Sequence, residues 1–302
     1  MISILIPTYN RPDFLKKAIE SCLDVKDYRV EILVGDDSQV SNITIINGIN
    51  LPSNYTIHYY HHSKALKQNQ NVDDLLMKAS GNYGLILHDD DYLLGNGLSQ
   101  LIQIAKAYPT QKLIVFGKQI LIDDTGNFLN SNNLNKDYLR IKELEGLQEN
   151  AVNNVLLQQV PSDSFLFPLE IAKTISYRHY NKVGDACDFD FALRMVLEGE
   201  CELFFIYENI SAYRISQTSV SRGKAYNSIY FKYEILKELD IKTNYPKIYQ
   251  KILYKDINIL CGYYINNKYK KKLRNLYFNS DYPIKKRFTI RGIYHLAMIF
   301  IK

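Results

Sequence analysis

The stretch GNYGLILHDDDYLLGNGL, residues 81–98, decides the fold of this 302-residue chain. It contains an apolar run over 83–87, typical of a buried strand, and then turns acidic at 89–91. Apolar residues at helical spacing follow over 97–107. A buried strand that ends in carboxylates and leads into a helix is typical of parallel sheets that are covered by helices.

The N-terminal part of the chain repeats this alternation. Strands are predicted over 2–6, 29–34, 56–60 and 112–116, and helices over 13–23 and 72–79. The pattern predicts an α/β fold with a mainly parallel central sheet flanked by helices. Ligands of such sheets bind beyond the carboxyl ends of the strands. The polar clusters at 7–11, 36–37 and 89–91 are therefore expected to meet at one edge of the sheet.

The later part of the chain is less regular. A hairpin with loops is predicted over 117–147, followed by a helix over 190–197 and strands over 204–206 and 210–214. Beyond about Arg222 the chain becomes rich in lysine and tyrosine, with helices predicted over 226–239 and 249–264. We predict one α/β domain over 1–222 and a C-terminal helical region over 223–302.

Composition excludes several classes of protein. With 46% hydrophobic and 23% charged residues the chain is globular rather than disordered, and a net charge of +5 does not indicate nucleic-acid binding. The four cysteines form no CxxC pair, which predicts reduced thiols rather than disulfides or structural zinc. The N-terminus lacks a basic leader, and no run reaches about 20 apolar residues. A cytoplasmic location, or one at the inner face of the cell membrane, is expected.

Three consecutive aspartates, Asp89, Asp90 and Asp91, repel one another unless a cation compensates their charge. Oxygen ligands suit Mg²⁺ and Mn²⁺, which can keep open positions for phosphate oxygens. The alternative is a solvated acidic turn. The strand before the cluster, and the second acidic pair Asp36–Asp37 after another strand, favour the metal site.

Other strand-end residues suit a nucleotide. Asp37 can accept hydrogen bonds from a base or ribose, or it can cap the next segment. Tyr9 offers a ring on which a base can stack, and Arg11 offers a cation. The simpler alternative for Tyr9 is packing within the protein, and for Arg11 it is an ordinary surface charge.

Five segments together resemble the inverting glycosyltransferases of family 2, which have the nucleotide-sugar fold called GT-A. They are ISILIPTYNRPDFLKKAIES (2–21), VEILVGDDS (30–38), GNYGLILHDDDYLLGNGL (81–98), GDACDFDFALRM (184–195) and SAYRISQTSVS (211–221). Each segment is moderately specific, but five in the family's order make a strong signal. The resemblance covers roughly residues 1–221 and implies that 1–222 is the catalytic domain.

The resemblance implies a role for several strand-end residues. The nucleoside pocket would be lined by Pro7, Thr8, Tyr9 and Arg11, with Asp37 at the base. The family's Asp-x-Asp motif falls on 88–90, so that Asp90 would bind the metal and Asp89 would lie near ribose or sugar. A shifted register would use Asp89 and Asp91. Asn71 and Asp73 are weaker candidates for contact with the donor sugar.

The same resemblance implies that Asp188 is the catalytic base. Its register follows from Asp190 and Arg194, which fit the family's Asp-x-x-x-Arg pattern. Cys187 stands where relatives often have glutamate, and Asp185 is a nearby competitor. The simpler alternative is that Asp188 only caps the helix that follows.

Two departures from the family pattern concern the metal. His88 replaces the usual first aspartate, and Ser216 stands where many relatives carry a histidine that reaches the metal or the diphosphate. Arg214, Arg222 or Lys224 are expected to assist the diphosphate instead.

The function that the resemblance implies is inverting transfer of a sugar from a nucleotide diphosphate-sugar, with a UDP-sugar favoured, to a bacterial surface polysaccharide such as a capsule, or to a glycolipid. The divalent metal would be Mn²⁺ or Mg²⁺. A nucleotide-sugar-binding module without turnover is the alternative. A nucleotidyltransferase ranks lower because PTYNRPDF, residues 7–14, contains no glycine, and a Rossmann dehydrogenase is disfavoured because GxGxxG is absent.

The C-terminal helices offer several interpretations. They could hold the acceptor, form a homodimer, or lie on a membrane. Residues 285–302 mix lysine and arginine with aromatic and aliphatic residues, which makes them a candidate for peripheral membrane contact. Ordinary packed helices share this composition.

Overall fold

The computed structural model describes residues 1–129, 133–215 and 225–301. They fall into two compact units, of which the first comprises Met1–Tyr180 with Cys187–Gln217 and the second Asn181–Ala186 with Thr218–Lys302. The predicted boundary between residues 222 and 223 lies outside the described residues, so the proposed division at that point stays a prediction.

The first unit is built on one sheet with the strand order β3-β2-β1-β4-β8-β6-β9-β5, and β7 pairs with β9. The strands are β1 (Ile2–Thr8), β2 (Val30–Asp36), β3 (Tyr55–His61), β4 (Tyr83–Ile86), β5 (Tyr92–Leu93), β6 (Leu113–Ile122), β7 (Gly146–Leu147), β8 (Leu166–Pro168) and β9 (Glu202–Arg214). β1, β2, β3 and β4 are parallel neighbours, as are β6 and β9. The short strands β5, β7 and β8 pair antiparallel. The predicted α/β class with a central sheet is confirmed.

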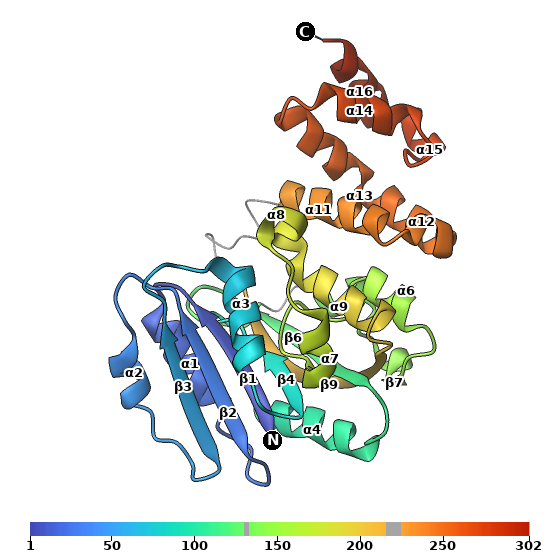
Figure 1. Ribbon diagram of the computed structural model, residues 1–302. Helices are drawn as coiled ribbons and strands as arrows, with labels where there is room; N and C mark the ends of the chain where they lie inside the picture. Colours follow the sequence, from blue (N-terminus) through green and yellow to red (C-terminus); the bar gives the residue numbers. More distant parts are fainter. Residues whose placement is uncertain (130–132, 216–224, 302) are drawn as a thin grey trace. The chain divides into compact units, whose positions relative to one another are not determined.

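Helices cover both faces of this sheet (Figure 1). They are α1 (Pro12–Ser21), α2 (Ile43–Asn47), α3 (Lys67–Lys78), α4 (Gly97–Ala107), α5 (Leu134–Asp137), α6 (Ala151–Leu156), α7 (Leu169–Ile175) and α9 (Cys187–Leu197), with a short 3₁₀ turn η1 (Lys142–Leu144). α1 begins at Pro12, where the fixed φ of proline suits a first helical position.

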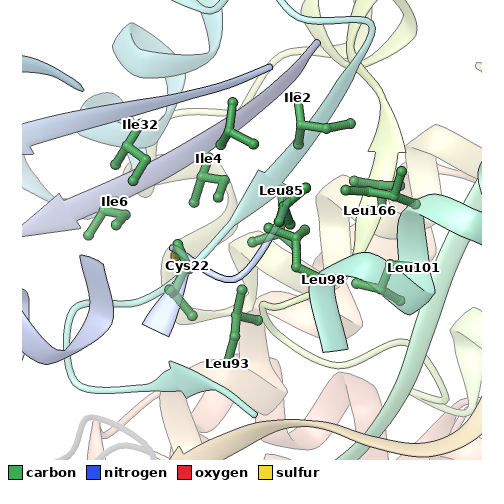
Figure 2. Close-up of a cluster of buried hydrophobic side chains, with 14 of the residues drawn as sticks. Ile2, Ile4, Ile6, Cys22, Ile32, Leu85, Leu93, Leu98, Leu101 and Leu166 are labelled. Atoms are coloured by element: carbon green, nitrogen blue, oxygen red, sulfur yellow. The ribbon is translucent and has the colours of Figure 1, made fainter. Parts of the chain in front are cut away.

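Alternate residues of β1 face opposite layers, because side chains alternate along a strand. Ile2, Ile4 and Ile6 join β2 and β4 in one hydrophobic cluster with the apolar stripes of α1 and α4, including Cys22 and Leu101 (Figure 2). All of these side chains are buried. Burial of this run on both faces explains why it reads as continuous apolar sequence rather than as an alternating one.

α3, α7 and α9 pack on the other face of the sheet. The ring of Phe167 in β8 lies 5.5 Å from that of Phe191 in α9, and Leu75 of α3 and Leu169 of α7 are buried. Asn71 of α3 donates to the carbonyl of Gly35 at 2.8 Å, so α3 is held directly against β2.

The predicted strands over 204–206 and 210–214 are one strand, β9. Opposite Gly117 and Lys118 the register of β9 jumps from Ile206 to Asn209, which leaves a bulge at residues 207–208. The polar bulge separates two apolar runs, and this is why they read as two strands. β6 also continues to Ile122, beyond the predicted end at 116, and bridges to Phe128 across a turn.

The second unit is helical, as predicted. It contains most of α8 (Tyr180–Val183), a 3₁₀ turn η2 (Gly184–Ala186), and α11 (Ala225–Glu238), α12 (Ile241–Asn244), α13 (Pro246–Asn266), α14 (Lys270–Phe278), α15 (Ile284–Arg287) and α16 (Ile290–Phe300). Tyr249, Ile257 and Cys261 of α13 are buried at its centre. A buried ion pair joins Lys232 to Asp256. No helix in the described ranges is long and apolar enough to cross a membrane.

Candidate active site

The carboxyl ends of β1, β2 and β4 meet at one edge of the sheet, as the sequence predicts. The Thr8 hydroxyl donates to Asp89 at 2.8 Å, and the backbone N–H of Tyr9 donates to the same carboxylate at 3.2 Å. The backbone N–H of Asn10 donates to the Ser38 hydroxyl at 2.7 Å, which joins the β1 end to the β2 end. Asn10 has a φ of +55°, a left-handed conformation that asparagine tolerates and that turns the chain after β1.

Arg11 bridges two carboxylates of the acidic run. Its Nη1 lies 3.0 Å from Asp89 Oδ1 and 2.7 Å from Asp90 Oδ2. Burial works against the charge of the guanidinium, but Asp89 and Asp90 outweigh it and raise the pKa of Arg11. Arg11 is therefore a fixed cation at the strand ends rather than a free surface charge, while the ring of the neighbouring Tyr9 is 54% exposed. Pro7 lies buried within β1.

Asp89 is buried, and its environment differs from that of Asp90. Burial and the neighbouring charge of Asp90 raise the pKa of Asp89, although Arg11 and Thr8 oppose the shift. Its oxygens receive the three donors from Thr8, Tyr9 and Arg11. Asp89 thus fixes the loop that follows β1, while the side chain of the half-buried Asp90 accepts from Arg11.

Asp91 lies on the buried side of the cluster. Its Oδ1 accepts from the backbone N–H of Arg214 at 2.7 Å, and its buried Oδ2 has no hydrogen-bond partner among the residues that the structure describes. Burial and the negative charge of Asp163 hold the pKa of Asp91 well above its usual range. This carboxylate ties the acidic run to the end of β9.

His88 lies among four carboxylates. Burial disfavours its charged form, but Asp163, Asp188, Asp90 and Asp89 together raise the pKa of the ring. In the part of the chain that the structure describes, its buried Nε2 has no hydrogen-bond partner. His88 therefore supplies positive charge to the cluster when its ring is protonated.

Among the described residues, His88, Asp91 and Asp163 form a group that could hold a metal ion. One ligand atom from each residue lies within 4.8 Å of the others. Within the described ranges, His88 and Asp91 each have a buried polar atom that makes no hydrogen bond, so both atoms are available to a cation. One imidazole and two carboxylates suit Mn²⁺, so the residues fit a divalent metal at or beside the acidic run.

Asp163, which sequence reasoning missed, is fully buried. It accepts from the backbone N–H of His88 at 3.2 Å and from the Gln119 side chain at 3.1 Å. Gln119 in turn accepts from Arg140, whose pKa burial lowers to about 10. A single aspartate in PSDSF, residues 161–165, carries no local pattern that could have marked it.

Asp188 lies in the first turn of α9, which begins three residues earlier than the predicted helix. Burial raises the pKa of Asp188, while His88 and the Tyr177 hydroxyl, which donates to Asp188 at 3.0 Å, act against the shift. Tyr177 is a second residue that sequence reasoning missed. A carboxylate with a raised pKa, held by one phenol, is suited to accept a proton.

The Asp-x-x-x-Arg pair holds the segment that carries Tyr177. Asp190 pairs with both Arg178 and Arg194, and Arg194 also donates to the carbonyls of Ile175 and Ser176. The backbone N–H of Tyr177 donates to Asp73 at 2.8 Å. The two motif residues therefore have a positioning role, because they hold residues 175–178 against the start of α9.

Asp36 and Asp37 differ in role. Asp36 is fully buried and accepts from Ser38, Asn42 and Tyr59. Asp37 accepts from the backbone N–H groups of Leu66 and Lys67 at 3.0 and 2.8 Å, and it contacts His62 at 2.8 Å. Asp37 thus anchors the start of α3, and its contact with a base stays a prediction.

Arg214 is engaged in the fold of the acidic run rather than free for a diphosphate. Its side chain donates to the carbonyls of Asp90, Asp123 and Asp124 at 2.8, 2.7 and 3.1 Å. The guanidinium also lies over the Phe14 ring, 4.4 Å from its centre. Ser216, Arg222 and Lys224 lie outside the described residues.

A surface cavity of about 630 Å³ lies at the opposite end of the strands, near the starts of β4 and β6. Its lining includes Asn82, Pro109, Thr110 and Glu170. It contains none of the clustered carboxylates, so size alone does not mark the site of chemistry.

Known proteins with similar sequences are glycosyltransferases. The sequence profile of Glycosyl transferase family 2 matches residues 3–162, more than half of the chain. A GalNAc(5)-diNAcBac-PP-undecaprenol beta-1,3-glucosyltransferase of Campylobacter jejuni is 26% identical over 257 residues, which cover 83% of this chain and 78% of the relative. An uncharacterized glycosyltransferase of Haemophilus influenzae is 27% identical over 245 residues, covering 78% and 90%.

Solved structures share the fold. TarS of S. aureus in complex with UDP-GlcNAc superimposes with a TM-score of 0.58 at 12% identity, covering 99% of this chain and 80% of that one. A mannosyltransferase of Pyrobaculum calidifontis in complex with GDP-Man and Mn²⁺ gives 0.57 at 11% identity, covering 98% and 85%. The predicted nucleotide-sugar fold is confirmed.

Asp91→Asn is expected to stabilise the chain at neutral pH. The folded chain holds a proton on Asp91 at pH values where the unfolded chain has released it, so stability falls as pH rises from about 3.9 toward the raised folded pKa. Asparagine removes this loss and keeps the oxygen that accepts from Arg214. The midpoint of thermal unfolding should rise by a few degrees, about 2–4 °C per kcal/mol, near neutral pH. It should not change below about pH 3.5, where the carboxyl is protonated in both states.

The exposed Asp27 provides the matched control, since Asp27→Asn removes the charge of a carboxylate that is not buried. A lower melting point for Asp91→Asn at neutral pH would show that the ionised carboxylate stabilises the fold.

Proposed function

The chain belongs to glycosyl transferase family 2, and from this premise we propose that it is a metal-dependent, inverting glycosyltransferase. It transfers a sugar from a nucleotide diphosphate-sugar to an acceptor in polysaccharide synthesis. The inverting mechanism, the metal and the site residues are the parts of this statement that we propose.

One observation carries the proposal. His88, at the end of β4, lies close enough to Asp188 in α9 and to Asp89 and Asp90 for all three charges to act on it. Residues 100 positions apart in the sequence are therefore brought to one place. A base for the acceptor and carboxylates for the leaving group are the two parts that an inverting transfer needs.

The proposed reaction is a single displacement. Asp188 takes the proton from an acceptor hydroxyl, whose oxygen attacks the anomeric carbon from the face opposite the diphosphate. The bond between that carbon and the diphosphate oxygen breaks, and the nucleotide diphosphate leaves with the electron pair. General-base assistance of this kind contributes roughly 10²–10⁴-fold in rate.

We propose Asp90 and Asp91 as metal ligands, with His88 and Asp163 beside them. A bound Mn²⁺ or Mg²⁺ would neutralise charge on the diphosphate. Asp90 is the more accessible of the two aspartates, since Asp91 is 2% exposed and already bonded to the backbone of Arg214. Arg11 holds Asp90 in place at 2.7 Å and adds a cation at the same edge.

For the donor we propose a UDP-sugar. Pro7, Thr8, Tyr9 and Arg11 would line the nucleoside pocket with Asp89, and Asp37 would contact the base. The exposed ring of Tyr9 supports base stacking, and TarS, of the same fold, was solved with UDP and with UDP-GlcNAc.

For the acceptor we propose a glycan carried on a membrane lipid, or a capsule-type surface polysaccharide. The Campylobacter jejuni relative is named for an undecaprenol-linked acceptor. We propose that the chain meets such an acceptor at the inner face of the cell membrane, and residues 285–302 remain our prediction for that contact. Formation of a homodimer also stays a prediction.

Asp188→Asn should lower kcat by about 10²–10⁴-fold, because the amide cannot accept the acceptor proton. Asp185→Asn is the matched control. It lies three residues away, and its carboxylate accepts from Asn227 at 2.7 Å. Release of UDP from a UDP-sugar in the presence of an acceptor glycan is the measurement. Equal losses in both variants would mean that Asp188 is not the base.

Tyr177→Phe should shift the acidic limb of the pH–rate profile to higher pH. The phenol stabilises the ionised carboxylate, so its loss raises the pKa of Asp188 further. We expect kcat/KM several-fold below that of the original chain at acidic pH and equal to it at alkaline pH. Tyr83→Phe is the control, since its hydroxyl donates to the Ala105 carbonyl at 3.4 Å and not to a carboxylate of the site. A uniform loss at every pH would indicate a merely structural role.

Mn²⁺ should raise the melting point of the chain more in the presence of UDP than alone, because a ligand that binds the folded state stabilises it. Asp90→Asn should remove the part of the shift that depends on Mn²⁺ and keep the part due to UDP. Asp27→Asn should retain both. An unchanged effect of Mn²⁺ on the melting point of Asp90→Asn would show that Asp90 is not a metal ligand.

A further inference from the structure

Helix α16 has two apolar faces. One face buries Gly292, His295 and Ile299 within the second unit. Four large side chains on the other face are exposed: Ile290 (89%), Ile293 (61%), Tyr294 (52%) and Phe300 (68%). Their spacing, i, i+3, i+4 and i+10, places them along one side of the helix. Packing within the second unit accounts for the buried face and leaves the exposed one unexplained.

The segment before α16 extends this exposed surface. Ile284 at the start of α15 is 66% exposed, and Phe288 after α15 is 81% exposed. Ile301, which follows α16, is 55% exposed. Apolar side chains scattered singly are ordinary on protein surfaces, but seven exposed ones within the 18 residues 284–301 indicate an interaction site. We call the exposed side chains of residues 284–301 the terminal surface.

The net charge of the chain is concentrated in the same segment. Residues 282–302 contain five of the 37 basic residues and none of the 32 acidic ones. In the rest of the chain the numbers of basic and acidic residues are therefore equal. The five are Lys285, Lys286, Arg287, Arg291 and Lys302. The whole excess of +5 therefore falls within the sequence segment 282–302, which carries the terminal surface.

Two of these cations are exposed and two make contacts within the second unit. Lys285 and Arg291 are exposed. Lys286 lies 4.3 Å from the centre of the Tyr254 ring, and Arg287 donates to the Asn279 carbonyl at 2.8 Å. His295 adds no charge near neutral pH, because burial and then the cation of Arg291 lower its pKa to about 4.

We propose that the terminal surface docks on the face of an anionic lipid bilayer. Aliphatic and aromatic side chains on one side of a helix can enter the boundary between headgroups and acyl chains, while flanking cations bind anionic headgroups. A symmetric dimer would place the same patch on both partners and bring its like charges together. An anionic bilayer complements the charge instead. The proposal concerns binding alone and does not depend on the sugar-transfer chemistry.

Flotation of the full chain with lipid vesicles tests the proposal. The chain should float with vesicles of phosphatidylcholine mixed with phosphatidylglycerol, remain unbound with phosphatidylcholine alone, and be released at high salt. The double variant Lys285→Gln/Arg291→Gln should weaken binding by about tenfold or more, since each cation near an anionic surface contributes roughly fivefold.

Loss of two apolar contacts is the second test. Ile290→Ser/Ile293→Ser should also weaken binding at least tenfold. Val40→Ser is the matched control, because Val40 is 79% exposed in the first unit and carries no proposed role. Circular dichroism and the melting point should match the original chain in each variant. If the double variant unfolds, Phe288→Ser replaces it, since Phe288 lies outside the helices.

Failure of the original chain to float with anionic vesicles would overturn the proposal, as would unchanged binding by the charge and apolar variants. Light scattering, which measures the oligomeric state, tests the alternative that a second copy of the chain covers the terminal surface. A dimer that dissociates in Ile290→Ser/Ile293→Ser, together with no vesicle binding, would assign the terminal surface to a second copy of this chain.

Discussion

The parallel pairing of β1 with β2 on one side and β4 on the other is the constraint on which the site depends. It forces the ends of three strands, and with them Thr8, Asp36 and His88, to one edge of the sheet. The acidic run after β4 then lies beside the loop after β1, where Asp89 and Arg11 meet at 3.0 Å. Crowded carboxylates repel one another, so each needs a donor or cation close by.

The fold supplies those donors from distant parts of the chain. Arg11 follows β1, the backbone of Arg214 ends β9, and Gln119 lies in β6. Asp91 and Asp188 both have raised pKa values because of burial, yet their neighbours differ. Asp91 faces another carboxylate, Asp163, whereas Asp188 faces the Tyr177 phenol and the His88 ring. This difference in environment supports our proposal that Asp91 binds the metal and that Asp188 is the base.

Much of the fold was predictable, because buried parallel strands have long apolar runs and helices have periodic ones. β1, β2, β4 and α4 are found where the sequence predicts them. β9 was split in two because its bulge at 207–208 interrupts the apolar pattern. The meeting of the strand ends followed from topology alone. Asp188, in contrast, was identified through a motif, since no periodicity marks it.

Asp163 and Tyr177 could not be found in this way. Each acts on a residue far along the chain or in the next helix, and neither belongs to a local pattern. Their contacts depend on long-range packing: Asp163 on Gln119 and His88, and Tyr177 on the ion pairs of Asp190. Sequence periodicity reports which face of an element is buried, but it does not report which buried polar groups meet.

The central claim is that the strand ends around Asp89 and Asp90 form the nucleotide-sugar site. A crystal structure of the full chain with UDP and Mn²⁺ tests it most directly. The account predicts density for the nucleotide beyond the ends of β1 and β2, with the diphosphate next to Asp90. Nucleotide bound elsewhere, for example in the cavity lined by Asn82 and Glu170 at the other end of the strands, would contradict it.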